Sequence, residues 1–196
     1  MVTLIFAPHA TTTDNENEIA SGHYDVDLSA LGRQQAHEMG ARYKDTSFDA
    51  VYTSDLRRAS HTAEIAFKGR GIPLIKDRRL RECDYGAWTR RSKGEVEAER
   101  IHRIQVPFPQ GESYTQTTER MKQFLQDLLA HYDGKKVLII GHRATHYALD
   151  HIIHRIPLAH ALTAHWRWQP GWTYALHEIN FSMPSHTTSN REANLT

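Results

Sequence analysis

The chain has 196 residues, of which 39% are apolar, and its 24 basic and 23 acidic side chains leave a net charge of +1. Its apolar runs are far shorter than the ~20 residues that a membrane-spanning helix needs, and its charge lacks the basic excess of a nucleic-acid-binding protein. Cys83 is the only cysteine, and no basic segment precedes the first apolar run. We therefore expect a cytoplasmic protein without disulfides that binds neither membrane nor nucleic acid.

The first part of the chain alternates apolar and polar stretches. Residues 2–7 are apolar on both faces and predict a buried strand, whereas the polar residues 10–26 predict a long loop. Apolar side chains then recur at helical spacing from Leu28 to Tyr43, with Asp27 as the expected N-cap. The pattern next predicts, in chain order, a strand over 50–52, a helix over 56–67 and a strand over 73–75.

The second part of the chain begins with an irregular excursion. Residues 80–111 have little periodicity and contain two prolines and three glycines, so they predict no more than one short helix. Ser113 and Gln116 match a capping box for a helix whose apolar stripe reaches Tyr132. The pattern then predicts a strand over 137–140, a helix from about 144 to 154, and later strands over 166–168 and 174–179.

We expect one domain over residues 1–182, followed by a polar, disordered tail over 183–196. Alternating strands and helices predict an α/β fold with a mainly parallel sheet, in which ligands bind beyond the carboxyl ends of the strands. Two apolar strands, "LIFAPH" and "VLIIGH", lead into His9 and His142. A single histidine at a strand end is more often structural than catalytic. Two of them at the same predicted edge indicate a functional site.

Two further segments carry candidate side chains. "YTSDLRRASHTAEIAF", residues 52–67, puts Arg57 and Arg58 in the first turn of a helix, where exposed N–H groups and a guanidinium fork suit phosphate. The alternative is a solvated surface arginine, and we expect it to hold for one of the two. "LRECDYGAW", residues 80–88, puts Glu82 in a loop beside aromatic residues, where on its own it would be an ordinary loop carboxylate.

In this order, the segments resemble the histidine phosphatase superfamily, in the branch that includes phosphoglycerate mutases and small-metabolite phosphatases. The resemblance covers residues 2 to about 155. It identifies His9 with the histidine that follows the first strand in that family, and Thr12 and Asn15 with a threonine and an asparagine further along. "GHYDVDLSALGRQQA", which starts at Gly22, loosely matches the next family segment.

The later segments follow the family order as well. "SDLRRA" matches Ser-Asp-Leu-x-Arg-Ala and identifies Arg58, rather than Arg57, with the phosphate-binding arginine. Glu82 matches the acidic residue before an aromatic-Gly-x-Trp segment, and "GES" at 111–113 and "GH" ending at His142 complete the series. The resemblance implies a three-layer α/β sandwich of the phosphoglycerate mutase type, with helices on both sides of a mainly parallel sheet.

The chain departs from the family pattern at three positions. Pro8 replaces the arginine before the first histidine, which is normally a phosphate ligand, and Ala10 replaces the glycine after it. Arg143 follows His142 where the family has glycine. Arg143 either replaces the missing guanidinium in the phosphate pocket, or faces solvent or pairs with a nearby carboxylate.

The resemblance implies a two-step phosphoryl transfer. Neutral His9 attacks phosphorus while Glu82 protonates the leaving oxygen, and water then hydrolyses the phosphohistidine with Glu82 as the base. The expected catalytic residues are His9, Glu82 and His142, and the resemblance implies Arg58, Asn15, Thr12 and Gly22 as phosphate or substrate ligands. Arg143 joins these ligands as the candidate that replaces the missing guanidinium. No metal or other cofactor is implied, the substrate is a small phosphorylated metabolite, and a homodimer is compatible with the pattern.

The excursion between Glu82 and Gly111 bears on the type of reaction. It spans 28 residues. The resemblance implies that true mutases carry a longer cap there, so the short segment favours a phosphatase. We expect Arg90, Arg91 and the loop from Tyr85 to Trp88 to line the entrance to the site.

Two other interpretations remain. His142 and His146 are four residues apart, which is a known spacing for metal ligands on a helix, although no third ligand is placed by the sequence. The second interpretation starts from Pro8 and the missing arginine. It is a remodelled family member that binds a phosphorylated or anionic ligand, or performs other chemistry, without phosphatase turnover.

Overall fold

The computed structural model describes residues 1–167 and 169–177. Within these residues, five strands form one sheet in the order β3-β2-β4-β1-β5. The strands are β1 (Val2–Pro8), β2 (Ala50–Thr53), β3 (Leu74–Lys76), β4 (Lys136–Gly141) and β5 (Trp172–Leu176). All neighbouring strands are parallel except β5, which runs antiparallel to β1. The prediction of a mainly parallel sheet is confirmed.

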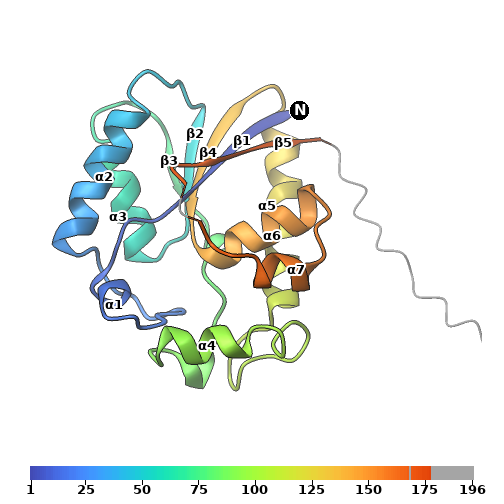
Figure 1. Ribbon diagram of the computed structural model, residues 1–196. Coiled ribbons are helices and arrows are strands. Elements are labelled where there is room, and N and C mark those ends of the chain that lie inside the picture. Colours follow the sequence, from blue (N-terminus) through green and yellow to red (C-terminus); the bar gives the residue numbers. More distant parts are fainter. Residues whose placement is uncertain (168, 178–196) are drawn as a thin grey trace, which may run out of the picture.

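Helices cover both faces of this sheet and make the fold a three-layer α/β sandwich (Figure 1). α2 and α3 pack together on one face, and α5 and α6 pack together on the other. The α-helices are α1 (Thr13–Glu16), α2 (Ala30–Arg42), α3 (Arg57–Ala66), α4 (Lys93–Glu99), α5 (Tyr114–His131), α6 (Arg143–Ile153) and α7 (Leu158–Thr163). Short 3-10 helices lie at Arg78–Leu80 and Gly86–Trp88.

The core lies on both faces of the central strands. Along β4, Val137 and Ile139 pack in the cluster formed with α5 and α6, whereas Leu138 and Ile140 pack in the cluster formed with α2 and α3. This is the two-residue alternation of side chains along a strand. Because both faces are covered by helices, the strand reads in the sequence as a continuous apolar run.

The expected start of α2 was wrong by two residues. The helix begins after Ser29, whose hydroxyl accepts a hydrogen bond from the Gly32 N–H at 3.1 Å. Asp27, the predicted N-cap, instead lies against α3, where its carboxylate pairs with Arg57 and with His61, each at 2.8 Å. Both residue types are good N-caps, so tertiary partners decide which one serves.

Two short helices were not predicted. The segment 10–26 was expected to be a loop but contains α1, whose N-cap Thr12 and third residue Asn15 form a reciprocal capping box. α7 follows Pro157 and was also missed. Helices of four and six residues present too few turns for a periodic apolar stripe to be recognised.

The last strand differs from the sequence prediction. β5 covers 172–176 and pairs with β1 from Val2 to Phe6, whereas the pattern predicted 174–179. Trp166 and Arg167, expected to form a strand, lie outside any strand, and residue 168 lies outside the described residues. Residues 178–196 lie outside them too, including the end of the predicted domain and its tail. None of the described helices is long and apolar enough to cross a membrane.

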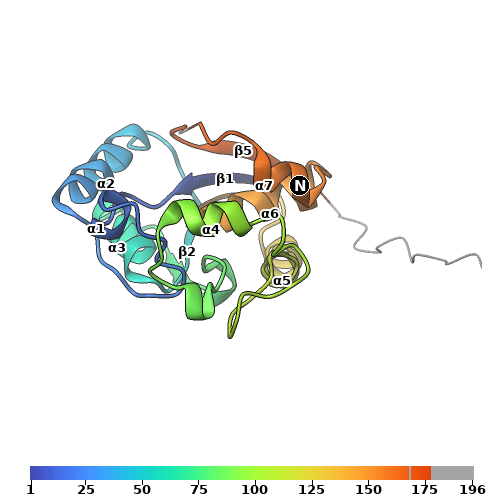
Figure 2. The same ribbon diagram turned by 60° about the horizontal axis from the view of Figure 1, so that its bottom comes forward.

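One end of the sheet gathers the strand ends that carry the candidate residues. The register pairs Pro8 with Gly141 and Thr53 with Ile140, so β1, β2 and β4 end side by side. Helix α4 lies beyond these strand ends (Figure 2). The irregular segment that contains α4 therefore faces the carboxyl edge, where ligands of α/β folds bind.

Candidate active site

The two strand-end histidines lie side by side. The backbone N–H of His9 donates to the carbonyl of Gly141 at 3.0 Å, which carries the β1–β4 pairing one residue past the strand. The centres of the His9 and His142 rings are 5.1 Å apart. The prediction that both histidines lie at the same edge of the sheet is confirmed.

His9 is held in one tautomer and in its neutral form. Its Nδ1 atom lies 2.8 Å from the carbonyl oxygen of Ala10. A carbonyl only accepts, so Nδ1 carries the proton and Nε2 keeps a free lone pair. Burial, together with the nearby Arg58 guanidinium, lowers the pKa of His9 to about 3. A neutral imidazole with a free Nε2 is a competent nucleophile at pH 7.

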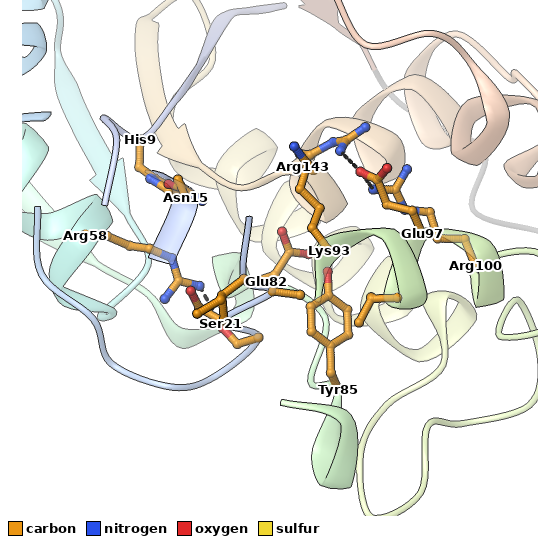
Figure 3. Close-up of a pocket in the computed structure, with 14 residues that line it drawn as sticks. His9, Asn15, Ser21, Arg58, Glu82, Tyr85, Lys93, Glu97, Arg100 and Arg143 are labelled. Atoms are coloured by element: carbon orange, nitrogen blue, oxygen red, sulfur yellow. Dashed lines mark hydrogen bonds and ion pairs between the residues drawn. The ribbon is translucent and has the colours of Figure 1, made fainter. Parts of the chain in front are cut away.

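Arg58 forms the buried cationic wall of the pocket beside His9 (Figure 3). The residue is 2% exposed, and its guanidinium donates to the carbonyls of Tyr24 at 3.0 Å and Gly22 at 2.7 Å. Burial lowers its pKa, but an arginine starts so high that it stays charged. Arg57, by contrast, pairs with Asp27 at the surface. The structure thus separates the two arginines as the motif predicted.

Glu82 faces the same pocket from the loop after the first 3-10 helix. Its Oε1 atom accepts hydrogen bonds from the Cys83 N–H at 2.8 Å and from the Ala144 N–H, in the first turn of α6, at 3.3 Å. Within the described chain its Oε2 atom has no hydrogen-bond partner. One carboxylate oxygen is therefore anchored by backbone N–H groups, while the other is free to exchange a proton with a ligand.

Of the three candidate ligands from the N-terminal segment, two line the pocket and the third lies outside its lining. Asn15 and Gly22 line the pocket. Gly22 has a φ of +50°, and an added Cβ would lie 3.0 Å from the Tyr85 ring, so the loop needs glycine there. Thr12 is fully buried beneath this loop, and its hydroxyl accepts from the Asn15 N–H at 3.0 Å. Thr12 therefore positions Asn15, and it lies outside the pocket lining formed by the described residues.

His142 lies behind His9 rather than in the pocket wall. It is 1% exposed, and its Nε2 atom is 2.7 Å from the hydroxyl of Ser54, which follows β2. Burial and the Arg58 charge hold its pKa well below the usual value, so it is neutral. Ser54 is the partner that sequence reasoning missed, although it is the first residue of the "SDLRRA" segment.

Arg143 lines the pocket but its guanidinium is engaged. It forms an ion pair through Nη1 with Glu97 of α4, which also accepts from Arg100 at 2.7 Å. Figure 3 shows the Arg143 guanidinium turned toward Glu97 rather than toward His9. Pairing with a carboxylate was the alternative left open by the sequence. The Arg143 Nε atom has no hydrogen-bond partner among the described residues, so the group retains donor capacity.

The outer wall of the pocket comes from α4. Lys93, Glu97 and Arg100 line it, and none of them was predicted as a site residue. The available signal was the pattern Ser-x-x-Glu at 92–95, which is the capping box that starts this helix. The expected entrance residues are only partly correct: Tyr85 lines the pocket, whereas Arg90 and Arg91 lie over the rings of Tyr24 and Trp88.

The metal interpretation finds no support in the side-chain arrangement. No group of three or more histidine, cysteine or acidic side chains with metal-ligand geometry occurs within 1–167 and 169–177. His146, the second member of the proposed pair, has its ring 4.5 Å from that of Trp172 and 5.3 Å from that of Trp166. His142 is directed to Ser54. The two rings therefore have separate surroundings.

Comparison with known proteins points to one family. The family model for the Histidine phosphatase superfamily (branch 1) matches residues 4–179. The chain is 33% identical over 150 residues to an uncharacterized phosphatase, PhoE, of Bacillus subtilis, with 76% of each chain covered. It is 31% identical over 194 residues to a 2,3-bisphosphoglycerate-dependent phosphoglycerate mutase of Latilactobacillus sakei, covering 80% of this chain and 81% of that one.

Solved structures give the same result. Bacillus stearothermophilus YhfR superposes with a TM-score of 0.78 at 27% identity, covering 87% of this chain and 88% of that one. A mycobacterial glucosyl-3-phosphoglycerate phosphatase superposes with a TM-score of 0.72 at 25% identity, covering 82% of this chain and 85% of that one. The fold thus matches a family that includes phosphatases and mutases.

Proposed function

Because the chain belongs to the histidine phosphatase superfamily, we propose that it is a phosphomonoesterase that hydrolyses a small phosphorylated metabolite through a phosphohistidine at His9. One observation carries the proposal: a neutral His9 with a free Nε2 faces the same pocket as the buried Arg58 and the free Oε2 atom of Glu82. Nucleophile, charge stabiliser and proton donor thus share one pocket.

In the first step, the lone pair of His9 Nε2 attacks phosphorus and the bond from phosphorus to the leaving oxygen breaks. Glu82 gives its proton to that oxygen, so the alcohol leaves neutral. The Nδ1–H of His9 stays hydrogen-bonded to the Ala10 carbonyl, which stabilises the ring as it gains the phosphoryl group. Arg58 stabilises the negative charge spread over the equatorial oxygens.

In the second step, the Glu82 carboxylate takes a proton from water as the water oxygen attacks phosphorus. The bond between phosphorus and Nε2 breaks, and its electron pair returns to the imidazole. Inorganic phosphate, neutral His9 and protonated Glu82 result, so the cycle closes with water as the only other reactant.

Hydrolysis is favoured over mutase transfer by the length of the segment above the pocket. It has 28 residues between Glu82 and Gly111, and it contributes one short helix, α4, to the pocket wall. A mutase must hold the released intermediate away from water while it reorients. The relatives include both phosphatases and mutases, so the reaction type rests on this segment.

A second candidate function is a remodelled site that binds a phosphorylated or anionic ligand without turnover. Pro8 contributes neither charge nor N–H where the family has a phosphate-binding arginine. His142, the other family phosphate ligand, is buried against Ser54 outside the pocket lining of the described chain. Arg58 is the family arginine that remains in the pocket, whereas Arg143, which stands where the family has glycine, is paired with Glu97.

The purified protein should be tested on a panel of phosphomonoesters, with acid-labile phosphohistidine measured after rapid quenching. We expect turnover, and we expect both turnover and the label on the protein to be lost in His9→Ala. Turnover that persists in His9→Ala would exclude the phosphohistidine route. Saturable binding of a phosphorylated ligand by the wild-type protein, with neither turnover nor label, would favour the remodelled site.

A further inference from the structure

We propose that Arg120, on α5, is a positioning residue that holds Glu82 in place for proton transfer. The proposal rests on the function proposed above, because it concerns the general acid of that reaction. Arg120 lies outside the pocket lining and outside every segment that carries the family resemblance. Its contacts nevertheless converge on the short stretch of backbone that carries Glu82.

The Arg120 guanidinium uses its full set of N–H donors. Nη1 donates to the carbonyls of Arg79 at 2.6 Å and Arg81 at 2.8 Å. Nη2 donates to the carbonyl of Glu82 at 2.7 Å and to Glu112 at 2.9 Å, and Nε donates to Glu112 at 2.9 Å. A guanidinium has five N–H groups in a rigid plane, and each one has an acceptor here. The side chain thus ties three carbonyls of one loop to α5.

Glu112 extends these contacts to the other side of Glu82. We call the pair formed by Arg120 and Glu112 the clamp. It binds Arg120 in a bidentate pair, and its Oε2 atom also accepts from the Asp84 N–H at 3.1 Å. The backbone is therefore held before Glu82, at Glu82 and two residues after it. The Arg120 and Glu112 side chains are 17% and 25% exposed, so solvent competes little for these hydrogen bonds.

The clamp matters because the Glu82 segment has no regular structure of its own. Glu82 lies between two short 3-10 helices and outside any ladder of backbone hydrogen bonds. Its carbonyl accepts from Arg120 and from His23 Nε2, at 2.7 Å and 2.8 Å. Its side chain reaches the first turn of α6. Loss of the clamp lets the loop move, and misplacement of a catalytic group by about 1 Å costs on the order of 10²-fold in rate.

If Arg120 positions the proton donor, the loss of kcat/KM on its substitution should depend on the leaving group of the substrate. An alkyl phosphate needs a proton on its leaving oxygen, whereas 4-nitrophenyl phosphate releases a stable anion that needs little help. Arg120→Lys keeps the positive charge but offers a flexible ammonium in place of the planar fork. We expect kcat/KM to fall roughly 10–100-fold for an alkyl phosphate and less than about threefold for 4-nitrophenyl phosphate.

Arg79→Lys is the matched control. The Arg79 side chain lies on the same loop and is also partly buried, but it pairs with Asp77 and Asp127 and leaves Glu82 untouched. We expect Arg79→Lys to lower kcat/KM equally and weakly for both substrates.

A second comparison uses Glu82→Gln. Once the proton donor is gone, Arg120→Lys should have no further effect on the alkyl phosphate, because the two residues act through one step.

The outcomes separate this proposal from the proposed function. If Arg120→Lys slows both substrates by the same factor, or adds its full effect in the Glu82→Gln background, Arg120 is structural and the positioning role is refuted while the phosphatase stands. If the wild-type protein hydrolyses neither substrate and forms no phosphohistidine, the phosphatase proposal fails and this one with it. Should Arg120→Lys not fold, Glu112→Gln removes the bidentate partner and should give the same dependence on the leaving group.

Discussion

The Ser54 hydroxyl lies 2.7 Å from the Nε2 atom of His142, and neither residue is more than 1% exposed. The contact joins the ends of β2 and β4 and spans 88 positions of the chain. It gives a buried, neutral imidazole one of the two partners that it needs. Because the centres of the His142 and His9 rings are 5.1 Å apart, this hydrogen bond also fixes a side chain that lies against the candidate nucleophile.

We expect Ser54→Ala to lower the free energy of unfolding by about 1–3 kcal/mol, because it leaves a buried imidazole nitrogen without a partner. Urea unfolding at pH 7 measures this. Ser60→Ala is the control: Ser60 is also buried, but its hydroxyl makes only a 3.4 Å hydrogen bond within its own helix. A Ser54→Ala midpoint equal to that of the wild type would show that the hydrogen bond contributes nothing.

The sequence predicted the centre of the site because its signals are local. A buried strand is a continuous apolar run, so the residue after it is easily located, and parallel strands put His9 and His142 at one edge. The assignment of Arg58 over Arg57 came from the family motif. Burial alone separates the two neighbours in the structure, and the helical period does not predict which of them is buried.

The periphery of the site was beyond prediction for a physical reason. α4 has seven residues and one buried side chain, Val96, so it shows no apolar stripe. The contacts of Arg120 are mostly with backbone carbonyls, which leave no trace in the identity of their residues. The Glu97–Arg143 pair joins residues 46 positions apart. Such contacts depend on the fold rather than on local patterns.

We expect Glu82→Gln to slow turnover of alkyl phosphates by roughly 10²–10⁴-fold, because glutamine has no proton to give to the leaving oxygen. Substrates with good leaving groups should lose less. Measuring kcat/KM across a series of substrates whose leaving groups differ in pKa tests this directly. An equal loss for every member of the series would assign Glu82 to binding rather than to proton transfer.

The stability of the protein should fall as the pH is lowered from about 6.5. Burial holds the pKa of His9 at about 3 and that of His142 well below its usual value. Below pH 6.5 the unfolded chain therefore binds protons that the folded chain does not, and acid favours unfolding. Each histidine contributes on the order of 1 kcal/mol per pH unit in this range, and nothing above it.

His9→Gln isolates the contribution of His9 to this pH dependence of stability, because glutamine does not titrate. Urea unfolding of both proteins at several pH values between 7 and 5 should show a shallower pH dependence for the variant. Identical slopes would mean that His9 takes up its proton in the folded protein near pH 6.5, and that its surroundings do not keep it neutral.

We expect Arg143→Ala to weaken inhibition by inorganic phosphate about tenfold, which corresponds to roughly 1.4 kcal/mol. Arg143 lines the pocket, and its guanidinium is paired with Glu97 while its buried Nε atom has no hydrogen-bond partner among the described residues, so a bound phosphate can compete for the guanidinium. Glu97→Gln should tighten phosphate binding by removing the competing carboxylate, and that gain should vanish when Arg143 is absent. Arg57→Ala, a change at a surface arginine paired with Asp27, is the control and should leave inhibition unchanged.

The substitution Pro8→Arg decides how far the pocket has been remodelled. Pro8 ends β1 beside Gly141, one residue before the nucleophile, and brings no charge to the pocket. A charged hydrogen bond is worth roughly 1.5–3 kcal/mol, so an arginine here should restore part of the phosphate inhibition lost in Arg143→Ala. The measurement is the inhibition constant of phosphate for the Arg143→Ala protein with and without Pro8→Arg.

If the added arginine leaves that constant unchanged, the space around His9 no longer accepts the family's phosphate geometry. A site built for a different anionic ligand then becomes the better description, because a pocket that still binds phosphate in the family's manner should bind it more tightly with a second guanidinium.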